Sequence, residues 1–282
     1  MPDSNLAQKK NFSSSPIKPI LKWAGGKQQL LSEIIQRVPS SFNRYIEPFV
    51  GGGAVFFAIE ANEYIISDTN PELINLYQTL SNGNFEDVIE KLESYKNEED
   101  FYYKTREKEV EKLTNIERSA RFIYLNRTCF NGLYRVNKKG EFNVPFGKYK
   151  NPRIIFPERL KKASEKLSKT KIYNLDYHEV LDTHSQKNDL IFLDPPYIPI
   201  SENASFKRYT KDQFRLNDQR KLAQLVRKLA EKGCKIILTN SNHPLIYELY
   251  DGFNIEVIET KRNINRNGNK RTGEDTIVSI NV

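Results

Sequence analysis

Two consecutive prolines, Pro195 and Pro196, constrain the fold of this chain more than any other feature. They follow the apolar run 190–193, and such a short continuous run predicts a fully buried strand. Proline donates no backbone N–H, so two prolines in a row cannot continue a sheet ladder. The chain must therefore leave the sheet stiffly at Asp194, and open α/β sheets bind their ligands at such carboxyl ends of strands.

The same turn gathers complementary chemical groups in the sequence Asp194-Pro195-Pro196-Tyr197. The aspartate offers a carboxylate, Pro195 offers a carbonyl, and the tyrosine offers an aromatic face. This set suits a flat ring that carries an NH2 group, because two oxygens accept the amine hydrogens while the ring stacks. Taken alone, the motif is equally compatible with an ordinary strand-ending turn, since proline fixes φ and aspartate tolerates turns.

The chain before this turn opens like a doubly wound α/β sheet. A strand from residue 45 leads into the glycines at 51–53, and helices are predicted at 26–38 and 54–61. A second strand over 64–67 ends at Asp68. Asn70 then predicts a helix start, with Pro71 at its first position. Strand, glycines, helix, strand, acidic residue and helix follow one another in the order typical of such folds.

The rest of the chain predicts one interrupted domain. Charged residues 85–121 predict helices, and Asn131-Gly132 and Lys139-Gly140 predict turns, the second between two short strands. The later elements are helices at 158–168 and 218–232 and strands at 171–175, 189–193, 235–240, 254–260 and 276–282. We therefore predict a flexible tail at 1–18, a cofactor-binding and catalytic domain from 19–84 and 155–282, and an inserted lobe at 85–154.

Composition bounds the classes of function. The formal net charge of +8 over 282 residues favours a polyanionic partner such as nucleic acid. Two distant cysteines, Cys129 and Cys234, indicate a reducing compartment, which we take to be the cytoplasm. The histidines His178, His184 and His243 lack metal-ligand spacing, so we expect no metal. No signal peptide and no membrane span are apparent in the sequence.

Two glycine elements predict a nucleoside cofactor. The glycines at 51–53 let a ligand approach the backbone closely, and Asp68 can accept bonds from both hydroxyls of a ribose. Upstream, Gly25 and Gly26 precede a predicted helix start and, with Lys27, favour an anion. Their spacing is not that of a P-loop. A ribose and a carboxylate without a phosphate indicate S-adenosylmethionine, although each element is also compatible with a plain tight turn.

Three motifs in this order carry a resemblance to a known family. They are Lys22-Trp23-Ala24-Gly25-Gly26-Lys27, Glu47-Pro48-Phe49-Val50-Gly51-Gly52-Gly53 and Asp194-Pro195-Pro196-Tyr197. The chain resembles the Dam-like DNA adenine-N6 methyltransferases of the alpha motif order, over nearly its whole length, and is similar to the Dam-like methylases of GATC restriction-modification systems. The resemblance implies a Rossmann-like S-adenosylmethionine-dependent methyltransferase sheet with an inserted helical and β-hairpin DNA-recognition lobe.

The resemblance also implies which residues bind the cofactor. They are Trp23, Ala24, Gly25, Lys27, Glu47, Pro48, Phe49, Gly51, Asp68, Asp176, Tyr177 and Asp194. Lys27 is expected to neutralise the cofactor carboxylate, Glu47 to contact its amino group, and Asp68 to hold the ribose diol.

For catalysis, the resemblance implies a target adenine that is flipped out of double-stranded DNA. Asp194 and the Pro195 carbonyl are then expected to accept the two N6 hydrogens, so that the nitrogen lone pair faces the sulfonium methyl group. The stiff turn includes Pro196, and Tyr197 is expected to stack on the base.

The inserted lobe is expected to bind the DNA. Arg135 suits guanine O6 and N7, Pro145 a thymine methyl, Lys22 an outer guanine and Arg127 a phosphate, which together point to GATC. The residues suited to the space that the flipped base leaves are Phe130, Asn131 and Leu133. Without the resemblance, these apolar residues are compatible with a core role and the arginines with a solvated surface. A companion restriction endonuclease acting on the same site is a further expected partner.

Other classes of function remain open at this point. The four-residue motif fits exocyclic amines in general, so a cytosine-N4 or RNA methyltransferase is an alternative. A non-enzymatic DNA-binding protein on a decayed methyltransferase scaffold is another, although intact Lys27, Asp68, Asp194 and Tyr197 argue against decay. A nicotinamide dehydrogenase is a distant alternative, because the phosphate fingerprint is missing.

Overall fold

A computed structural model describes residues 11–13, 15–198, 214–261 and 272–282 of the chain. The first ten residues of the predicted tail lie outside these ranges, as do 199–213 after the catalytic motif and the basic stretch 262–271. Within the described ranges, no helix combines the length and the apolar character that crossing a membrane requires.

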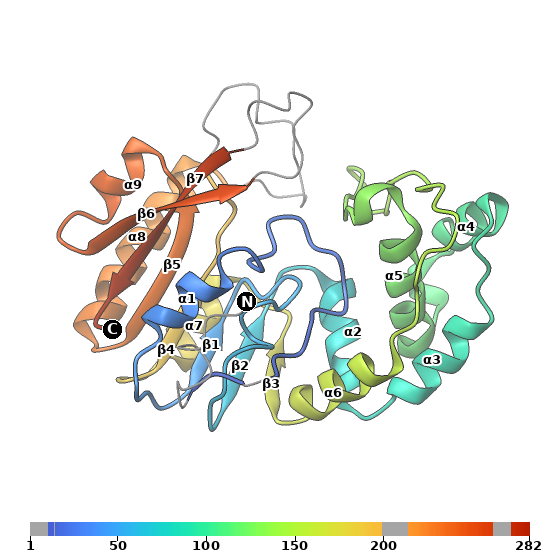
Figure 1. The fold of residues 1–282 in the computed structure, drawn as a ribbon, viewed down its shortest axis with the longest axis horizontal. Coiled ribbons are helices and arrows are strands. Elements are labelled where there is room, and N and C mark those ends of the chain that lie inside the picture. Colours follow the sequence, from blue (N-terminus) through green and yellow to red (C-terminus); the bar gives the residue numbers. More distant parts are fainter. Residues whose placement is uncertain (1–10, 14, 199–213, 262–271) are drawn as a thin grey trace.

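The described residues form one sheet of seven strands in the order β3-β2-β1-β4-β5-β7-β6 (Figure 1). Across the sheet the strands are β3 (Thr170–Tyr173), β2 (Tyr64–Ser67), β1 (Tyr45–Glu47), β4 (Leu190–Leu193), β5 (Lys235–Ser241), β7 (Thr272–Ile280) and β6 (Asn254–Lys261). All neighbours pair in parallel except β7, which is antiparallel to both β5 and β6. The strand order reverses between β1 and β4, and their carboxyl ends define the crevice where ligands bind in such sheets.

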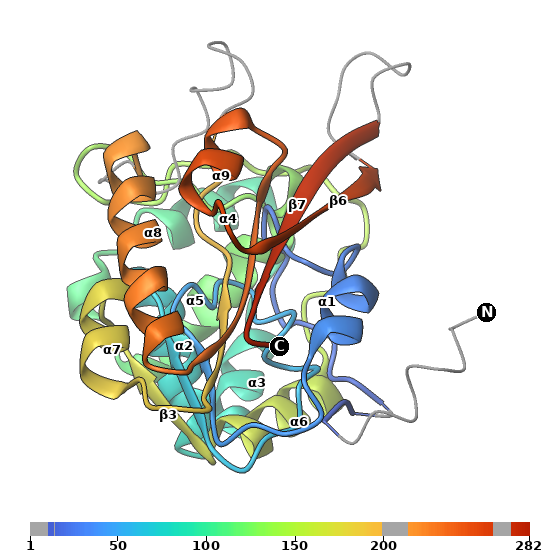
Figure 2. The same ribbon diagram turned by 90° about the vertical axis from the view of Figure 1, so that its left-hand side faces the viewer.

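Helices cover both faces of this sheet, as the edge-on view shows (Figure 2). One face carries α7 (Tyr177–His184), α8 (Leu216–Glu231) and α9 (Pro244–Leu249), and the other carries α1 (Leu31–Arg37), α2 (Pro71–Ser81) and α6 (Pro157–Leu167). Successive side chains of β4 alternate between the two hydrophobic clusters, because neighbouring residues of a strand point to opposite faces. The predicted doubly wound α/β fold is confirmed.

The start of α2 forms as the sequence predicts. The Asn70 side chain accepts hydrogen bonds from the backbone N–H groups of Glu72 and Leu73, and Pro71 occupies the first helical position. The cap satisfies donors that the helix itself leaves free. The helix start thus fixes the turn between β2 and α2, which contains Asp68.

The predicted helix over residues 54–61 is wrong, because this segment forms turns ending in an isolated bridge between Ile59 and Phe12. The N–H of Phe57 donates to the Gly53 carbonyl, so one helical turn begins. The carbonyl of Ala58 then accepts from residue 13 instead of continuing the helix. Pairing with the amino-terminal segment thus replaces helical hydrogen bonds in a run rich in β-branched and aromatic residues. The predicted helix over 26–38 is likewise shortened to α1 by turns up to residue 30.

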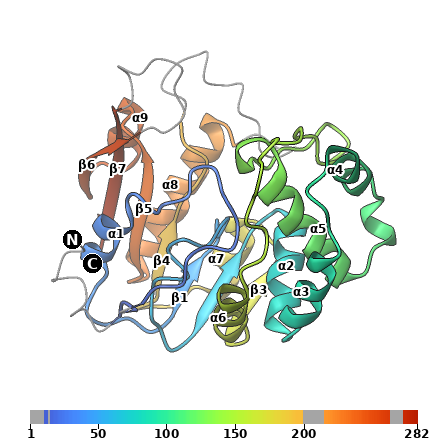
Figure 3. The ribbon, with the colours of Figure 1, turned by 45° about the vertical axis from the view of Figure 1, so that its right-hand side comes forward.

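The middle of the chain is helical and lies beside α2 (Figure 3). Its helices are α3 (Phe85–Glu93), α4 (Glu99–Arg106) and α5 (Asn115–Thr128), with single 3-10 turns η2 (Val110–Lys112) and η3 (Phe130–Gly132). The predicted second turn forms around Gly140, whose φ is +84°, but the flanking residues make only the isolated bridge Val136–Phe142. The buried side chains of α3 and α5 continue into the hydrophobic cluster of the sheet.

Candidate active site

The catalytic motif begins at the carboxyl end of β4, which pairs with β1 on one side and β5 on the other. Pro195 is buried, Asp194 and Tyr197 are partly exposed, and Pro196 is exposed. The side chain of Asp194 retains 20% of its exposure, so it is neither turned into the core nor freely solvated. The turn thus places its carboxylate at the carboxyl edge of the sheet, at the point where the strand order reverses.

Two side chains fix one oxygen of Asp194. Lys27 Nζ lies 2.7 Å from Oδ1, and the Thr239 hydroxyl donates to the same atom at 2.9 Å. Among the described residues, no hydrogen bond or ion pair falls on Oδ2. Burial raises the pKa of Asp194, and the charge and hydrogen bond of Lys27 oppose that rise. The carboxylate is therefore oriented, with one oxygen left for a ligand.

Lys27 occupies a position that its sequence neighbourhood does not reveal. Besides Asp194, its ammonium donates to the Gly25 carbonyl at 2.6 Å and lies 4.6 Å from the centre of the Tyr197 ring. The expected role at the cofactor carboxylate thus has a competing contact, because in this structure the charge already faces the catalytic motif. The residue is 7% exposed, so an unpaired charge here would be costly.

The backbone that follows Asp194 is held by three side chains that the sequence reasoning missed. Gln219 donates to the Pro196 carbonyl, Asn240 accepts from the N–H of Ile198, and Ser241 donates to the Ile198 carbonyl. A polar run at residues 239–242, directly after the apolar part of β5, was the available signal for two of them. No local pattern marks Gln219 among the other polar residues of α8.

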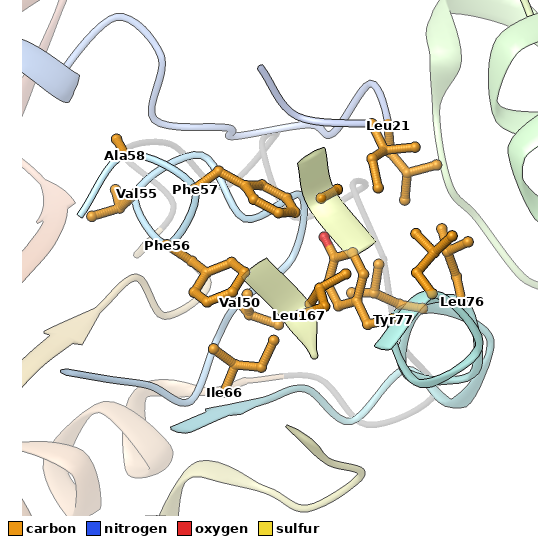
Figure 4. Packing of buried hydrophobic residues seen from close by; sticks show 14 of the residues in the cluster. Leu21, Val50, Val55, Phe56, Phe57, Ala58, Ile66, Leu76, Tyr77 and Leu167 are labelled. Carbon is orange, nitrogen blue, oxygen red and sulfur yellow. The ribbon is translucent and has the colours of Figure 1, made fainter. Parts of the chain in front are cut away.

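The glycine turn after β1 is shaped around Trp23. A Cβ added at Gly51 would lie 2.6 Å from the indole nitrogen, and one at Gly52 would lie 2.8 Å from the Trp23 Cβ. The backbone of Gly51 has φ +45°, which L side chains rarely adopt. Its carbonyl accepts from the Tyr77 hydroxyl at 2.7 Å, and Figure 4 shows Tyr77 within the packed side chains beneath this turn. The first two predicted cofactor motifs are therefore in direct contact.

Asp68 lies beside the same glycine turn. Its Oδ2 accepts from the Gly51 N–H at 3.0 Å and its Oδ1 from the Asn70 N–H at 2.9 Å. Burial raises its pKa, while these backbone N–H groups lower it. Each carboxylate oxygen keeps a further lone pair, which a ribose hydroxyl can use.

Glu47 is the most enclosed acid of the predicted cofactor set, at 2% exposure. The Tyr45 hydroxyl donates to its Oε2 at 2.6 Å. The pKa of Glu47 is raised to about 8, mainly by burial and also by the nearby Asp194 charge. A cationic group bound next to Glu47 would restore its charged form, so this carboxylate fits the amino group of an amino-acid moiety.

Aromatic rings line the side of the site formed by α7. Phe49 stacks on Tyr177 with ring centroids 5.2 Å apart, and Phe214 meets both rings edge-on. Asp176 caps α7 by accepting from the N–H groups of residues 178 and 179. The predicted pair Asp176 and Tyr177 thus lies next to Phe49, as expected for a pocket that holds a flat ring.

The predicted DNA-contacting residues gather after α5. Arg135 is exposed, and Asn143 orients it by accepting from Nε at 2.7 Å and from a terminal nitrogen at 3.1 Å. Phe130 is 51% exposed, which is unusual for so large an apolar side chain. Its N–H donates to the carbonyl of Pro145, another exposed residue, at 2.9 Å. Leu133 is partly exposed in the same segment.

Lys22 connects this segment to the cofactor motifs. Asn126 of α5 accepts from the Lys22 N–H and donates to the Lys22 carbonyl, both at 2.8 Å. The Lys22 ammonium lies 4.7 Å from the ring centre of Tyr149, whose hydroxyl accepts from the Asn131 N–H. Tyr149 thus contacts both the side chain of Lys22 and the backbone of Asn131, two exposed residues.

Arg127 differs from the exposed phosphate contact expected of it. It is 8% exposed, one terminal nitrogen donates to the Ile20 carbonyl, and its guanidinium lies over the ring of Phe156. Its pKa is lowered to about 10, mainly by burial and also by the charge of the neighbouring Arg159. Arg127 thus joins the end of α5 to residues 20 and 156, which cover its side chain.

No cluster in the described part of the chain brings together three or more histidine, cysteine, aspartate or glutamate side chains able to hold a metal ion. The site is built instead from three acids, Asp194, Asp68 and Glu47, with an oriented backbone turn, two glycine turns and aromatic faces. Such groups can position an amine and a nucleoside, and they present no nucleophile poised for covalent catalysis.

Known proteins are similar in sequence to this chain along nearly their whole length. The chain is 44% identical to the Type II methyltransferase M.MjaIII of Methanocaldococcus jannaschii, over 90% of this chain and 95% of that one. It is 40% identical to the Type II methyltransferase M1.LlaDCHI of Lactococcus lactis subsp. cremoris, over 99% and 98% of the two chains. It is 37% identical to the DNA adenine methylase of Haemophilus influenzae, over 93% of each.

The model of the D12 class N6 adenine-specific DNA methyltransferases matches residues 23–264, a range that begins at Trp23 and includes the whole catalytic motif. The match covers most of the chain, and the relatives named above are DNA adenine or type II methyltransferases. This protein belongs to the family of D12 class N6 adenine-specific DNA methyltransferases.

Proposed function

We propose that this protein methylates N6 of an adenine flipped out of double-stranded DNA, within the sequence GATC, using S-adenosylmethionine. The observation that carries the proposal is the asymmetric environment of Asp194. Lys27 and Thr239 engage Oδ1, while Oδ2 and the Pro195 carbonyl have no partner among the described residues. An exocyclic amine has two hydrogens and needs two such acceptors side by side.

The residues present fit S-adenosylmethionine as the cofactor. Buried Glu47 suits a cationic amino group, Asp68 suits a ribose diol, and Phe49 with Tyr177 suits a purine ring. Trp23 packs against Gly51 and Gly52, and Gly51 contacts Asp68. Ala24 and Gly25 follow Trp23 in the sequence, Pro48 lies between Glu47 and Phe49, and Asp176 precedes Tyr177. When bound, this cofactor supplies an electrophilic methyl group on a sulfonium sulfur.

The chain's own residues then act on the amine. Asp194 Oδ2 and the Pro195 carbonyl accept the two N6 hydrogens, which turns the nitrogen lone pair out of conjugation with the ring. Asp194 is able to take up the proton that N6 loses when the new N–C bond forms, because burial raises its pKa. Positioning and preoriented dipoles of this kind are each worth several kcal/mol.

The proposed base flipping follows from the distance between a stacked adenine and the two acceptor oxygens. The N6 atom of a stacked adenine cannot reach acceptors recessed in a crevice, and extrusion costs only a few kcal/mol of stacking and pairing. The exposed Phe130, with Asn131 and Leu133 beside it, is suited to the space that the base leaves. The ring of Tyr197, over which the Lys27 ammonium lies, is suited to stacking on the extruded base.

We assign the recognition of GATC to the side chains of Arg135, Pro145 and Lys22. Arg135 is braced by Asn143 in a way that leaves part of its guanidinium fork for guanine O6 and N7. Pro145 is suited to a thymine methyl, and Lys22 to an outer guanine. The type II names of two relatives support a restriction-modification context with a companion endonuclease for this chain.

The decisive experiment is methylation of DNA of mixed sequence with radiolabelled S-adenosylmethionine, followed by nucleoside analysis and mapping of the modified bases. The proposal expects N6-methyladenine confined to GATC. N4-methylcytosine would contradict the adenine target, and N6-methyladenine in another sequence would contradict the recognition residues while leaving the chemistry intact.

A further inference from the structure

Three buried side chains hold the backbone that follows the catalytic aspartate. The Pro196 carbonyl accepts from Gln219 Nε2 at 2.8 Å, the Ile198 N–H donates to Asn240 Oδ1 at 3.1 Å, and the Ile198 carbonyl accepts from the Ser241 hydroxyl at 2.7 Å. The three side chains are 2%, 0% and 2% exposed, in that order. Gln219 comes from α8 and the other two from β5, so the turn is held from two elements.

These side chains form one directed relay. Asn240 Oδ1 accepts from two backbone N–H groups, those of Ile198 and Ser241, and a backbone N–H can only donate. The amide nitrogen of Asn240 must therefore face Gln219, where it donates to Oε1 at 3.2 Å. The amide nitrogen of Gln219 is then left to face the Pro196 carbonyl. The orientation of both amides is thus determined by the backbone of the protein.

The relay supplies hydrogen bonds that the turn cannot make for itself. Pro195 and Pro196 have no N–H, so neither residue can tie the turn to a neighbouring strand by donating. The side chains of Gln219, Asn240 and Ser241 anchor the next peptide units instead. On the other side of the prolines, Thr239 anchors Asp194, so three consecutive residues of β5 contact the turn at both ends.

The two proline carbonyls have different roles, because one is hydrogen-bonded within the protein and the other is available to a substrate. The Pro196 carbonyl is occupied by Gln219, whereas the Pro195 carbonyl accepts no hydrogen bond from the described residues. Fixing the Pro196 carbonyl and both polar atoms of Ile198 restricts the rotation of the peptide plane before them. The direction of the Pro195 carbonyl is therefore set by groups that do not touch the substrate.

We propose that Gln219, Asn240 and Ser241 are positioning residues that aim the Pro195 carbonyl at the target amine. The inference rests on the proposed function, because it assigns a purpose to the geometry of that same acceptor. A displacement of about 1 Å in an acceptor is enough to lower a rate about 100-fold. Loss of the relay is thus expected to slow the chemical step while both ligands still bind.

The test compares two substitutions on one helix, Gln219→Glu and Gln224→Glu. Glutamate keeps the shape of glutamine, but when ionised it places an oxygen opposite the Pro196 carbonyl where a donor was. Gln224 is exposed on α8 and provides the matched control. We expect Gln219→Glu to lower the single-turnover rate of methyl transfer about 10- to 100-fold, with little change in the affinity for DNA or S-adenosylmethionine. Gln224→Glu is expected to match the parent protein.

The pH dependence of Gln219→Glu separates positioning from folding. A protonated glutamate can donate to the Pro196 carbonyl, so its deficit relative to the parent is expected to shrink as pH falls. Ser241→Ala provides a second variant that adds no buried charge, and it is expected to lower the same rate with ligand affinities retained. Thermal unfolding and cofactor titration accompany each measurement.

Unchanged rates in both Gln219→Glu and Ser241→Ala would overturn the inference. So would rates that fall only in parallel with cofactor binding and thermal stability, since the relay would then support the fold alone. Failure of the parent protein to methylate adenine in DNA would instead contradict the proposed function. The parent and variant rates thus distinguish the two failures.

Discussion

The turn at 194–198 and the segment at 129–147 are both irregular, yet they present different groups to a ligand. In the turn, buried side chains engage Asp194, Pro196 and Ile198, and the groups presented are a carboxylate and a backbone carbonyl. In the segment, Tyr102 and Asn126 also hold backbone carbonyls, but the side chains of Arg135 and Phe130 extend into solvent. Chemistry on an amine requires acceptors that do not move. Reading DNA requires side chains that reach into a groove, and the groove supplies part of their order.

The largest expected effect is at the centre of the rigid turn. Asp194→Ala removes the carboxylate that we propose accepts an N6 hydrogen, so we expect methyl transfer to fall by about 1000-fold or more. DNA affinity should stay close to that of the parent protein, because the segment at 129–147 is untouched. Single-turnover kinetics and a DNA titration measure the two quantities. Loss of DNA binding with retained turnover would reverse the comparison between the two regions.

Substitution of Lys27 tests whether this residue keeps the Asp194 carboxylate charged. Lys27→Met removes the group that opposes the upward pKa shift of Asp194, so the pKa of Asp194 should rise further. A protonated Asp194 is a poorer acceptor, and the acid limb of the rate profile should therefore move to higher pH. We expect a fall in rate of about 100-fold near neutral pH. Lys228→Met, at an exposed position of α8, is the matched control. An unchanged acid limb would remove Lys27 from this role.

Substitution of Arg135 tests the role of the segment at 129–147. Arg135→Ala should relax discrimination at one guanine by about 1–3 kcal/mol while leaving the maximal rate on a saturating GATC duplex nearly unchanged. Asn143→Ala, which removes only the brace of Arg135, should have the same effect at a smaller size. Competition between GATC duplexes and single-base variants gives the measurement. Equal discrimination by the parent and Arg135→Ala would exclude this residue as a base contact.

The smallest expected effect concerns the glycine turn at residues 51–53, which packs against Trp23. Gly51→Ala places a Cβ against Trp23, whereas Gly83→Ala, also at positive φ, meets nothing within 4 Å. Both substitutions should lower the free energy of unfolding by about 1–2 kcal/mol through backbone strain at positive φ, and Gly51→Ala should lower it more because its Cβ also meets Trp23. Only Gly51→Ala should also weaken S-adenosylmethionine binding, because it displaces the indole. Calorimetric titration of the two variants checks this, and equal affinities would separate Trp23 from the cofactor.

Local patterns in the sequence predicted the frame of this protein well. The apolar run before Asp194 and the Asn70-Pro71 helix start each depend on neighbours in the chain, and both formed as expected. The segment 54–61 did not, because pairing of Ile59 with the distant Phe12 replaced helical hydrogen bonds.

Contacts between distant segments account for what the sequence could not predict in the site. Lys27 meets Asp194 across 167 positions of the chain, and Gln219 reaches Pro196 from a different element. Nothing in the composition around either residue signals its partner. The burial of Arg127 has the same origin, since residues 20 and 156 cover it from outside its own helix.

The most direct measurement is a crystal structure of the protein with S-adenosylhomocysteine and a GATC duplex. The account predicts an extruded adenine whose N6 lies about 2.7–3.2 Å from both Asp194 Oδ2 and the Pro195 carbonyl oxygen. An adenine that stays stacked in the duplex, or an N6 beyond hydrogen-bonding reach of both oxygens, would contradict it.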